Sequence, residues 1–250
     1  MLRGLYAAAS GMLARVVHQE RLANDLANIN TAGYKADRTV TVSFPALLLA
    51  RLERGAGGMV GPLGTGAVVA EGGVDWSPGP LVETGRSTDL ALEGEGLFVV
   101  AGPGGTAYTR SGQFQVGPDG RLQTPDGWTV LSTEGTAIYP GTDDFRVTED
   151  GGVLVNGVLV GVVARVTFAN PAGLRKIGNN LFAATPASGP AVAAATPVRQ
   201  GYLEQSNVDP ARAVVEMLAN FRAFEAAQKV LQAQDQTLGL AVNEVGRVDR

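Results

Sequence analysis

Apolar residues recur at helical spacing at both ends of the chain. Between residues 3 and 30 there is no proline, and the glycines are Gly4 and Gly11. Within that stretch an apolar stripe runs through Leu5, Ala9, Met12, Val16, Ala23 and Leu26, flanked by Leu13, Leu22 and Ile29. This spacing predicts an amphipathic helix over 3–30, with Asn30, Thr31 and Gly33 as its stop and Gly33 suited to a left-handed cap.

A second helix is predicted over 209–246. Asp209 can cap its N-terminus, Pro210 suits the first helical position and Gly246 suits the stop. Its apolar residues repeat in sevens, in two series, each with one position per seven residues. One series holds Val214, Phe221 and Val242, with Gln228 and Asp235 as polar interruptions, and the other holds Met217, Phe224, Leu231, Leu238 and Val245. A sustained heptad repeat is typical of a coiled-coil seam.

The middle of the chain has the pattern of short strands joined by tight turns. Asp-Gly pairs occur at 119–120, 126–127 and 150–151, and Asn-Gly at 156–157, with strand-like apolar runs around them. These pairs favour β-hairpins. The expected fold class is therefore α+β, with N- and C-terminal helices paired in a coiled-coil domain and a central β-rich domain.

The predicted organisation has three parts. Residues 1–34 plus 205–250 form the terminal helical domain, 35–80 an extended connector and 81–204 the β-rich domain. The stripe on the first helix is broader than one partner helix can cover, which leaves apolar surface for neighbouring subunits. Periodicity alone favours packing within one subunit and packing between subunits about equally.

Composition restricts the possible classes of protein. The 250 residues are 45% hydrophobic and 18% charged, with 34 glycines, which describes a folded chain rich in turns. A net charge of −4 argues against nucleic acid as a partner, and no apolar run is long enough to insert in a membrane. Cysteine is absent, which excludes disulfides and thiolate metal sites. Charged residues at helical spacing interrupt the N-terminal apolar run, so we expect a mature helix rather than a cleaved signal peptide.

The search for catalytic groups finds little. His18 is the one histidine, and a solvated or interfacial role is favoured because no second histidine can complete a metal site or triad. Acidic pairs occur at Glu93/Glu95 and Asp143/Asp144, but the glycines around the first pair indicate a turn. We therefore expect no enzyme activity, no catalytic residues, no cofactor and no metal.

Several blocks of the sequence resemble the bacterial flagellar rod and hook proteins. They are LYAAASGM (5–12), LANDLANINTAGYK (22–35), STDLALEGEGLFVV (87–100), the stretch from YTRSG (108–112) to WTVL (128–131), FANPAGLRKIGNNLF (168–182) and the stretch from QGYLEQSN (200–207) to AAQKV (226–230). They occur in the order typical of basal-body rod proteins and cover most of the chain.

The resemblance implies a structural subunit of the flagellar basal-body rod, the helically built hollow shaft between motor and hook, with a hook-like central β-rich domain. Its implied partners are copies of itself, other rod and hook subunits and the flagellar type III export apparatus. The implied location is the flagellum basal body, reached without a cleaved signal. Length and the AVNEVGRV stretch slightly favour the F (proximal) over the G (distal) type. The alternatives are a secreted β-rich fibre or adhesin protein and a peptidoglycan-active enzyme of the basal body.

The expected intersubunit residues are apolar positions on the two helices together with two amides. Asn24 and Asn28 are expected to bond laterally to neighbouring helices. The full set is Leu5, Met12, Leu13, Leu22, Asn24, Leu26, Asn28, Ile29, Met217, Phe221, Phe224, Leu231 and Leu238.

Overall fold

The chain folds as two compact units. A computed structural model describes residues 2–43, 47–51, 58–63 and 66–245. Unit 1 comprises Met1–Leu26, Asp37–Gly72 and Pro210–Arg250, and unit 2 comprises Ala27–Ala36 and Gly73–Asp209. The expected α+β class is confirmed, and the expected connector at 35–80 carries four of the strands.

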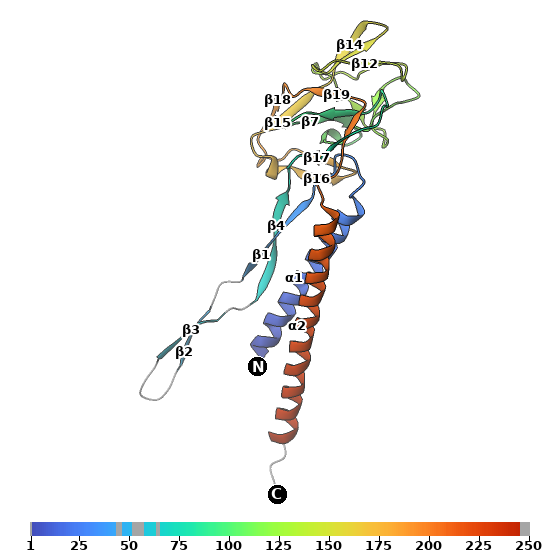
Figure 1. Cartoon of the computed structure of the whole chain (residues 1–250). Coiled ribbons are helices and arrows are strands. Elements are labelled where there is room, and N and C mark those ends of the chain that lie inside the picture. The colour runs from blue at the N-terminus through green and yellow to red at the C-terminus, as the bar shows by residue number, and fades with distance from the viewer. Residues whose placement is uncertain (1, 44–46, 52–57, 64–65, 246–250) are drawn as a thin grey trace. The chain divides into compact units, whose positions relative to one another are not determined.

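Two long helices dominate unit 1 (Figure 1). Helix α1 spans Leu2–Ala27 and helix α2 spans Pro210–Val245. Helix α2 begins at the expected proline, whereas Gly246 lies outside the described residues. Helix α1 ends three residues before the predicted end, because Asn28 starts a turn in which its carbonyl accepts the Thr31 N–H at 3.1 Å. Asn28 and Ile29 therefore lie beyond the helix.

The two helices run antiparallel and are in contact. The Asn220 side-chain amide of α2 donates to the Arg15 carbonyl and to the Gln19 side chain of α1, each at 2.9 Å. Farther along, a Cβ built on Gly4 would lie 2.5 Å from the Gln234 side chain. Asn220 is 3% exposed, so its hydrogen bonds are made in a buried position, where an unbonded amide would be costly.

The contact uses one of the two heptad series found in the sequence. Met217, Phe224, Leu231 and Leu238 are all half-buried. The other series is exposed throughout the described helix, and Phe221 is 53% exposed. The positions one residue before each member of this exposed series are covered instead: Ala213 and Asn220 are buried, and Ala227, Gln234 and Ala241 are half-buried. Small and polar residues allow the close approach seen at Gly4, and therefore large apolar residues are left on the outer side of α2.

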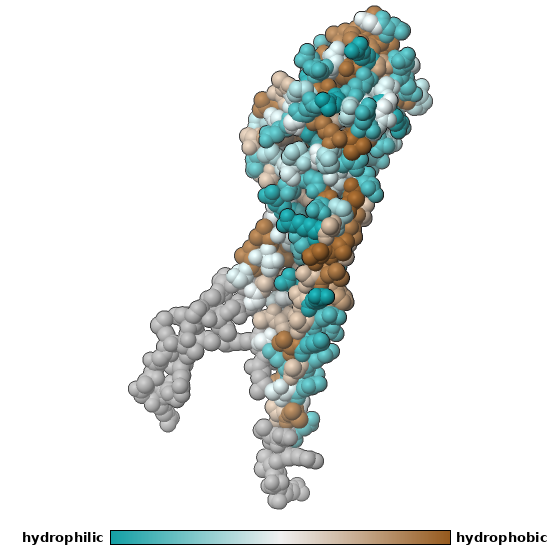
Figure 2. All heavy atoms as spheres, viewed as in Figure 1, coloured by the Kyte–Doolittle hydropathy of each residue, from teal (hydrophilic) through white to brown (hydrophobic). Residues whose placement is uncertain are grey.

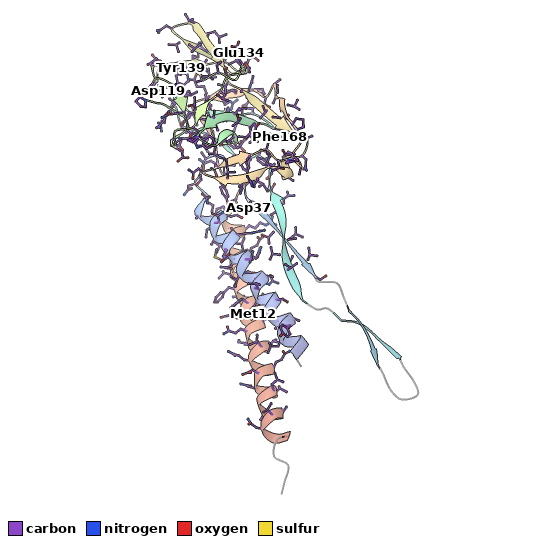
Figure 3. All side chains as sticks on the ribbon, turned by 180° about the vertical axis from the view of Figure 1, so that it is seen from behind. Met12, Asp37, Asp119, Glu134, Tyr139 and Phe168 are labelled. Atoms are coloured by element: carbon purple, nitrogen blue, oxygen red, sulfur yellow. The ribbon has the colours of Figure 1, made fainter. Side chains whose placement is uncertain are left out.

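Four strands of unit 1 lie between the two helices in sequence. Strand β1 (Asp37–Ser43) pairs with β4 (Ala67–Val74), and β2 (Leu47–Arg51) pairs with β3 (Gly58–Leu63). Hydrogen bonds hold the first pair to α1: the Ala67 N–H donates to the Ser10 hydroxyl at 3.3 Å, and the Asp37 N–H to the Asp25 carboxylate at 3.3 Å. Figure 3 shows Asp37 at the start of β1 and Met12 on α1.

Unit 2 is built of short strands. A nine-stranded sheet has the order β16-β17-β8-β7-β11-β10-β9, with β15 joining β7 to β18. The other groups are β12-β13-β14, β19-β6 and β20-β5. The bounds are β5 Leu81–Glu83, β6 Leu90–Leu92, β7 Leu97–Gly102, β8 Gly105–Thr109, β9 Gln115–Val116, β10 Leu122–Gln123, β11 Thr129–Val130, β12 Arg146–Val147, β13 Gly152–Val155, β14 Val158–Val162, β15 Arg165–Phe168, β16 Arg175–Gly178, β17 Leu181–Ala183, β18 Ala191–Ala193, β19 Val198–Gln200 and β20 Tyr202–Glu204.

The predicted turns fall between these strands. Gly120, Gly127 and Gly151 all have positive φ, as tight turns after Asp require. At the β13–β14 hairpin both Asn156 (φ 52°) and Gly157 (φ 82°) are left-handed, which matches a two-residue type I′ turn. The hairpin reading of these pairs is confirmed.

Two hydrophobic clusters form the core of unit 2. The larger cluster includes Leu90, Phe98, Phe114, Leu122 and Val153. The rings of Phe98 and Phe114 pack edge to face, with their centroids 5.2 Å apart. The smaller cluster is formed by Leu97, Phe168, Leu174 and Phe182. Trp76 packs against it, with its ring centroid 4.8 Å from that of Phe182. Neither long helix in the described part of the chain has a stretch apolar enough to cross a membrane.

Candidate functional site: a buried carboxylate cluster

The most constrained group of side chains in unit 2 surrounds Glu204, at the end of β20. One carboxylate oxygen accepts the Lys35 ammonium at 2.6 Å and the Gly79 N–H at 2.9 Å, and the other accepts Arg110 Nε at 2.5 Å. The side chains of Lys35, Arg110 and Glu204 are only 2%, 5% and 2% exposed. We call these three residues and Asn207 the Glu204 cluster.

The charge balance of the cluster fixes Glu204 as an anion at neutral pH. Burial by itself raises the pKa of Glu204, but the charge of Arg110 and the hydrogen bonds from Lys35 and Gly79 outweigh it, so the pKa is below its ordinary value. Burial lowers the pKa of Lys35, and the bond to Glu204 opposes that shift. Removing Glu204 would leave two buried cations without a counter-charge.

Arg110 connects the cluster to the glycine-rich turn of residues 93–96. Its guanidinium donates to the carbonyls of Leu92 (3.0 Å), Gly94 (2.6 Å) and Gly96 (2.6 Å) as well as to Glu204. Gly94 and Gly96 have φ of 133° and 144°, values that side-chain-bearing residues rarely adopt. The LEGEGLF block therefore curves its backbone around the arginine of the YTRSG block.

Lys35 brings the chain segment that follows α1 into the cluster. The Gly33 N–H donates to the Glu204 carbonyl at 2.7 Å, and Gly33 has φ of 67°, the left-handed value expected from the sequence. A Cβ at Gly33 would overlap the backbone of Arg110 and Ser111. The Asn180 amide donates to the Ala32 carbonyl at 3.0 Å, and the Lys176 ammonium lies 4.7 Å from the centre of the Tyr34 ring.

Asn207 completes the cluster by joining two more backbone segments. Its amide oxygen accepts the Ala36 N–H at 2.9 Å, and its amide nitrogen donates to the carbonyls of Asp75 (2.8 Å) and Ser77 (3.2 Å). Lys35 also donates to the Ser77 carbonyl, at 2.7 Å. Segments 32–36, 75–79 and 204–207 thus meet at the side chains of Glu204 and Asn207. The groups of the first two segments that bond to these side chains lie 125 to 171 residues away in the sequence, and Arg110 lies 94 residues from Glu204.

The hydrogen bonds of the cluster hold backbone segments together. Acid–base or nucleophilic catalysis needs a polar group that faces the reactant. The three charged side chains of the cluster instead bond to one another and to backbone groups in the protein interior. Among the described residues no three His, Asp or Glu side chains come together to hold a metal ion. Glu93, one of the acids considered in the sequence, pairs with Arg199 at 2.7 Å at the surface.

The structure distributes the residues expected at intersubunit contacts over different environments. Leu22 is buried inside unit 1, whereas Leu13 and Phe221 are 67% and 53% exposed. Asn24 is exposed on α1, and the Asn28 amide oxygen accepts the Thr31 hydroxyl at 3.1 Å. The rest are half-buried: Leu5, Met12, Leu26, Ile29, Met217, Phe224, Leu231 and Leu238.

The Glu204 cluster was not found from the sequence, because Lys35 and Glu204 are 169 residues apart and Arg110 and Glu204 94 apart. The available signal was indirect. The four residues lie in three of the blocks that carry the family resemblance. Lys35 ends the LANDLANINTAGYK block, Arg110 lies in YTRSG, and Glu204 and Asn207 both lie in QGYLEQSN. No single block indicates the cluster, but in the folded chain residues of all three blocks bond to one another.

The fold and the cluster together define a class of protein: an α+β protein whose two long terminal helices are in contact and whose β-rich unit contains a buried ionic cluster. Comparison with known proteins specifies the family. The family described as flagellar hook protein FlgE/F/G D1 domain matches residues 91–155, and the family described as flagellar basal body rod FlgEFG protein C-terminal matches residues 199–244.

Whole-chain relatives agree with these matches. The chain is 35% identical to the flagellar basal-body rod protein FlgG of Bacillus subtilis, with 97% of this chain and 99% of that protein covered. It is 36% identical to the FlgG protein of Agrobacterium fabrum (94% and 96% covered) and 34% identical to the flagellar hook-basal body complex protein FlhO of Bacillus subtilis (99% and 100% covered). The chain belongs to the flagellar basal-body rod protein family. None of these three names supports the slight preference for the F type.

We predict that Glu204→Gln strongly destabilises unit 2, because it leaves Lys35 and Arg110 buried without a counter-charge. The expected loss is about 3–5 kcal/mol in the free energy of unfolding. Urea unfolding followed by tryptophan fluorescence measures it, since the two tryptophans, Trp76 and Trp128, belong to unit 2. The matched control is Glu93→Gln at the exposed ion pair, for which we expect about 0–1 kcal/mol. Equal losses in the two variants would contradict this role of the cluster.

We predict that Gly33→Ala is more destabilising than Gly85→Ala. Both glycines have nearly the same φ, 67° and 69°, so each substitution carries the same left-handed backbone cost of about 1–2 kcal/mol. A Cβ at Gly85 has open space around it, whereas one at Gly33 overlaps backbone atoms. We expect the excess for Gly33→Ala to be about 1–3 kcal/mol in urea unfolding. Indistinguishable losses would show that the close approach is unimportant.

The lowered pKa of Glu204 predicts acid sensitivity of unit 2. Because the pKa in the folded chain is below its ordinary value of 4.5, the stabilisation is complete above that value and is lost as pH falls below it toward the folded pKa. The urea midpoint from tryptophan fluorescence should fall over this range, and less steeply in Glu204→Gln. Parallel pH profiles for the two proteins would exclude Glu204 as the source.

Proposed function

We propose that this chain is a structural subunit of the bacterial flagellar basal-body rod, assembling with copies of itself and with other rod and hook subunits. Whole-chain similarity to proteins named for that rod is the observation that carries the proposal. The paired terminal helices and the β-rich body are consistent with it. Export through the flagellar type III apparatus without a cleaved signal, and a place in the periplasm-spanning rod, belong to the same proposal.

In this proposal the terminal helices form a coiled coil and provide the contacts between subunits. The support comes from the residues that the α1–α2 contact leaves outside. Brown, apolar patches are visible on α2 in Figure 2. Seven large apolar side chains of this helix are exposed: Val214, Val215, Leu218, Phe221, Val230, Leu240 and Val242. On α1, Tyr6 and Leu13 are also more than two-thirds exposed, at 69% and 67%.

So many large apolar side chains exposed on one helix are unusual on a protein that functions alone, and they support an interaction site there. The faces on α1 and α2 differ in sequence, so a contact between them on neighbouring subunits joins two different surfaces. Such a heterologous contact need not close into a ring and can generate a helical shaft. The intersubunit set proposed from the sequence divides accordingly: Leu13 and Phe221 are available to neighbours, and Leu22 serves the fold of its own subunit.

The Glu204 cluster supports a mechanical role in the same proposal. A rod that transmits rotation needs subunits whose segments do not slide against one another. The cluster holds segments 32–36, 75–79 and 204–207 together through buried charge-assisted bonds, which are stronger and more directional than apolar contacts.

We predict that Phe221→Glu abolishes rod assembly and swimming while the purified chain keeps its fold. A carboxylate buried in an apolar contact is strongly unfavourable, and the cost recurs at every subunit. Swimming in soft agar and recovery of basal bodies measure assembly, and circular dichroism with tryptophan fluorescence measures the fold.

The control for this variant is Gln236→Glu, which adds the same charge to α2 at a position that is already polar and exposed. It should leave assembly intact. Normal swimming by Phe221→Glu would refute the proposed contact, and loss of the fold in that variant would be tested separately with Leu13→Glu on α1. A folded chain that never joins purified basal bodies, even unmutated, would refute the rod function itself.

A further inference from the structure

The contact between α1 and α2 contains a titratable group that the rod function does not use. His18 is half-buried on α1, and its Nδ1 atom is enclosed without a hydrogen-bond partner in the described structure. Its neighbour Gln19 receives a hydrogen bond from Asn220 of α2, and Arg15, one turn earlier, receives another through its carbonyl. The imidazole is therefore held where the helices meet.

The bare Nδ1 atom favours the neutral form of His18. A neutral imidazole needs only one N–H, so the other nitrogen can remain without a proton, whereas an imidazolium carries an N–H on both. Protonation would thus create a buried donor without an acceptor at Nδ1, and would place a positive charge in a partly buried position.

The charged groups around His18 act in both directions. On α1, Arg15 and Arg21 oppose protonation and Asp25 favours it; Asp25 also accepts the Asp37 N–H of β1. On α2, Glu216 favours protonation, but its carboxylate already accepts Arg212 Nε at 2.9 Å. Burial is the largest influence, and with Arg15 it keeps the pKa of His18 below its ordinary value of 6.5.

We propose that His18 makes the pairing of α1 and α2 sensitive to pH, so that the helices pair firmly around neutral imidazole and separate more readily once it is protonated. Pairing is at full strength above the unfolded pKa of the imidazole. It weakens as pH falls below that value and stops changing once pH is below the pKa of the paired state.

The sequence makes this inference directly measurable. His18 is the one histidine in 250 residues, so histidine labelled with carbon-13 at Cε1 gives a single NMR signal from the full chain. We expect the pKa read from that signal to be lower in the native chain than in concentrated urea. A native pKa equal to or above the value in urea would overturn the proposal.

The second measurement follows the helices themselves. Among the described residues α1 and α2 supply nearly all of the helical structure, so the circular dichroism signal of helices reports unit 1, while tryptophan fluorescence reports unit 2. Between about pH 7.5 and about pH 5 the thermal midpoint of the helical signal should fall by a few degrees, with the fluorescence midpoint nearly unchanged.

Two variants make the test specific. His18→Gln keeps a polar side chain of similar length that does not titrate, so its helical midpoint should not depend on pH in this range. Glu216→Gln removes the α2 carboxylate that favours protonation, so the NMR titration should give a still lower pKa for His18. An unchanged pH dependence in His18→Gln, or a raised pKa in Glu216→Gln, would refute the proposal.

Discussion

The structure of unit 2 depends on the burial of one carboxylate. Placing Glu204 in the interior is unfavourable unless its charge is balanced and its oxygens are bonded, and three donors from three distant segments satisfy that condition. Because loss of Glu204 would leave two buried cations without a counter-charge, and loss of any donor would leave a buried carboxylate oxygen with fewer hydrogen bonds, the contacts depend on one another. The cluster thereby specifies which segments meet, in addition to stabilising their contact.

The constraint extends from the carboxylate to the local backbone. Arg110 can reach Glu204 only with its other donors satisfied, and this requires the carbonyls of Gly94 and Gly96 to turn inward. Lys35 can reach Glu204 only if the chain after α1 approaches the Arg110–Ser111 backbone, and this requires a residue without Cβ at position 33. The glycines of the LEGEGLF and TAGYK blocks are therefore consequences of the same buried ion pair system.

These relations explain how much of the fold and site the sequence could predict. Local signals were sufficient where the cause is local: Pro210 begins α2, Gly33 is left-handed, and Asn156–Gly157 forms the hairpin turn. The helical pattern of α1 continued past its real end because Ile29 fits the stripe, whereas the Asn28–Thr31 turn stops the helix at Ala27. The cluster could not be predicted, because nothing near Lys35 in the sequence indicates a partner 169 residues away.

The heptad repeat of α2 shows why apolar periodicity alone is ambiguous between contacts within and between subunits. Pairing with α1 uses the Met217 series together with Asn220 and the small residues of its series, since a small side chain permits close approach and a bonded amide fixes the alignment of the helices. Large apolar residues one position later remain on the outside, where they lower the solubility of an isolated chain and favour burial against another. The contact with α1 thus combines large apolar, small and polar positions, while further large apolar side chains of α2 stay exposed, and so the periodicity of the helix does not by itself distinguish the two kinds of contact.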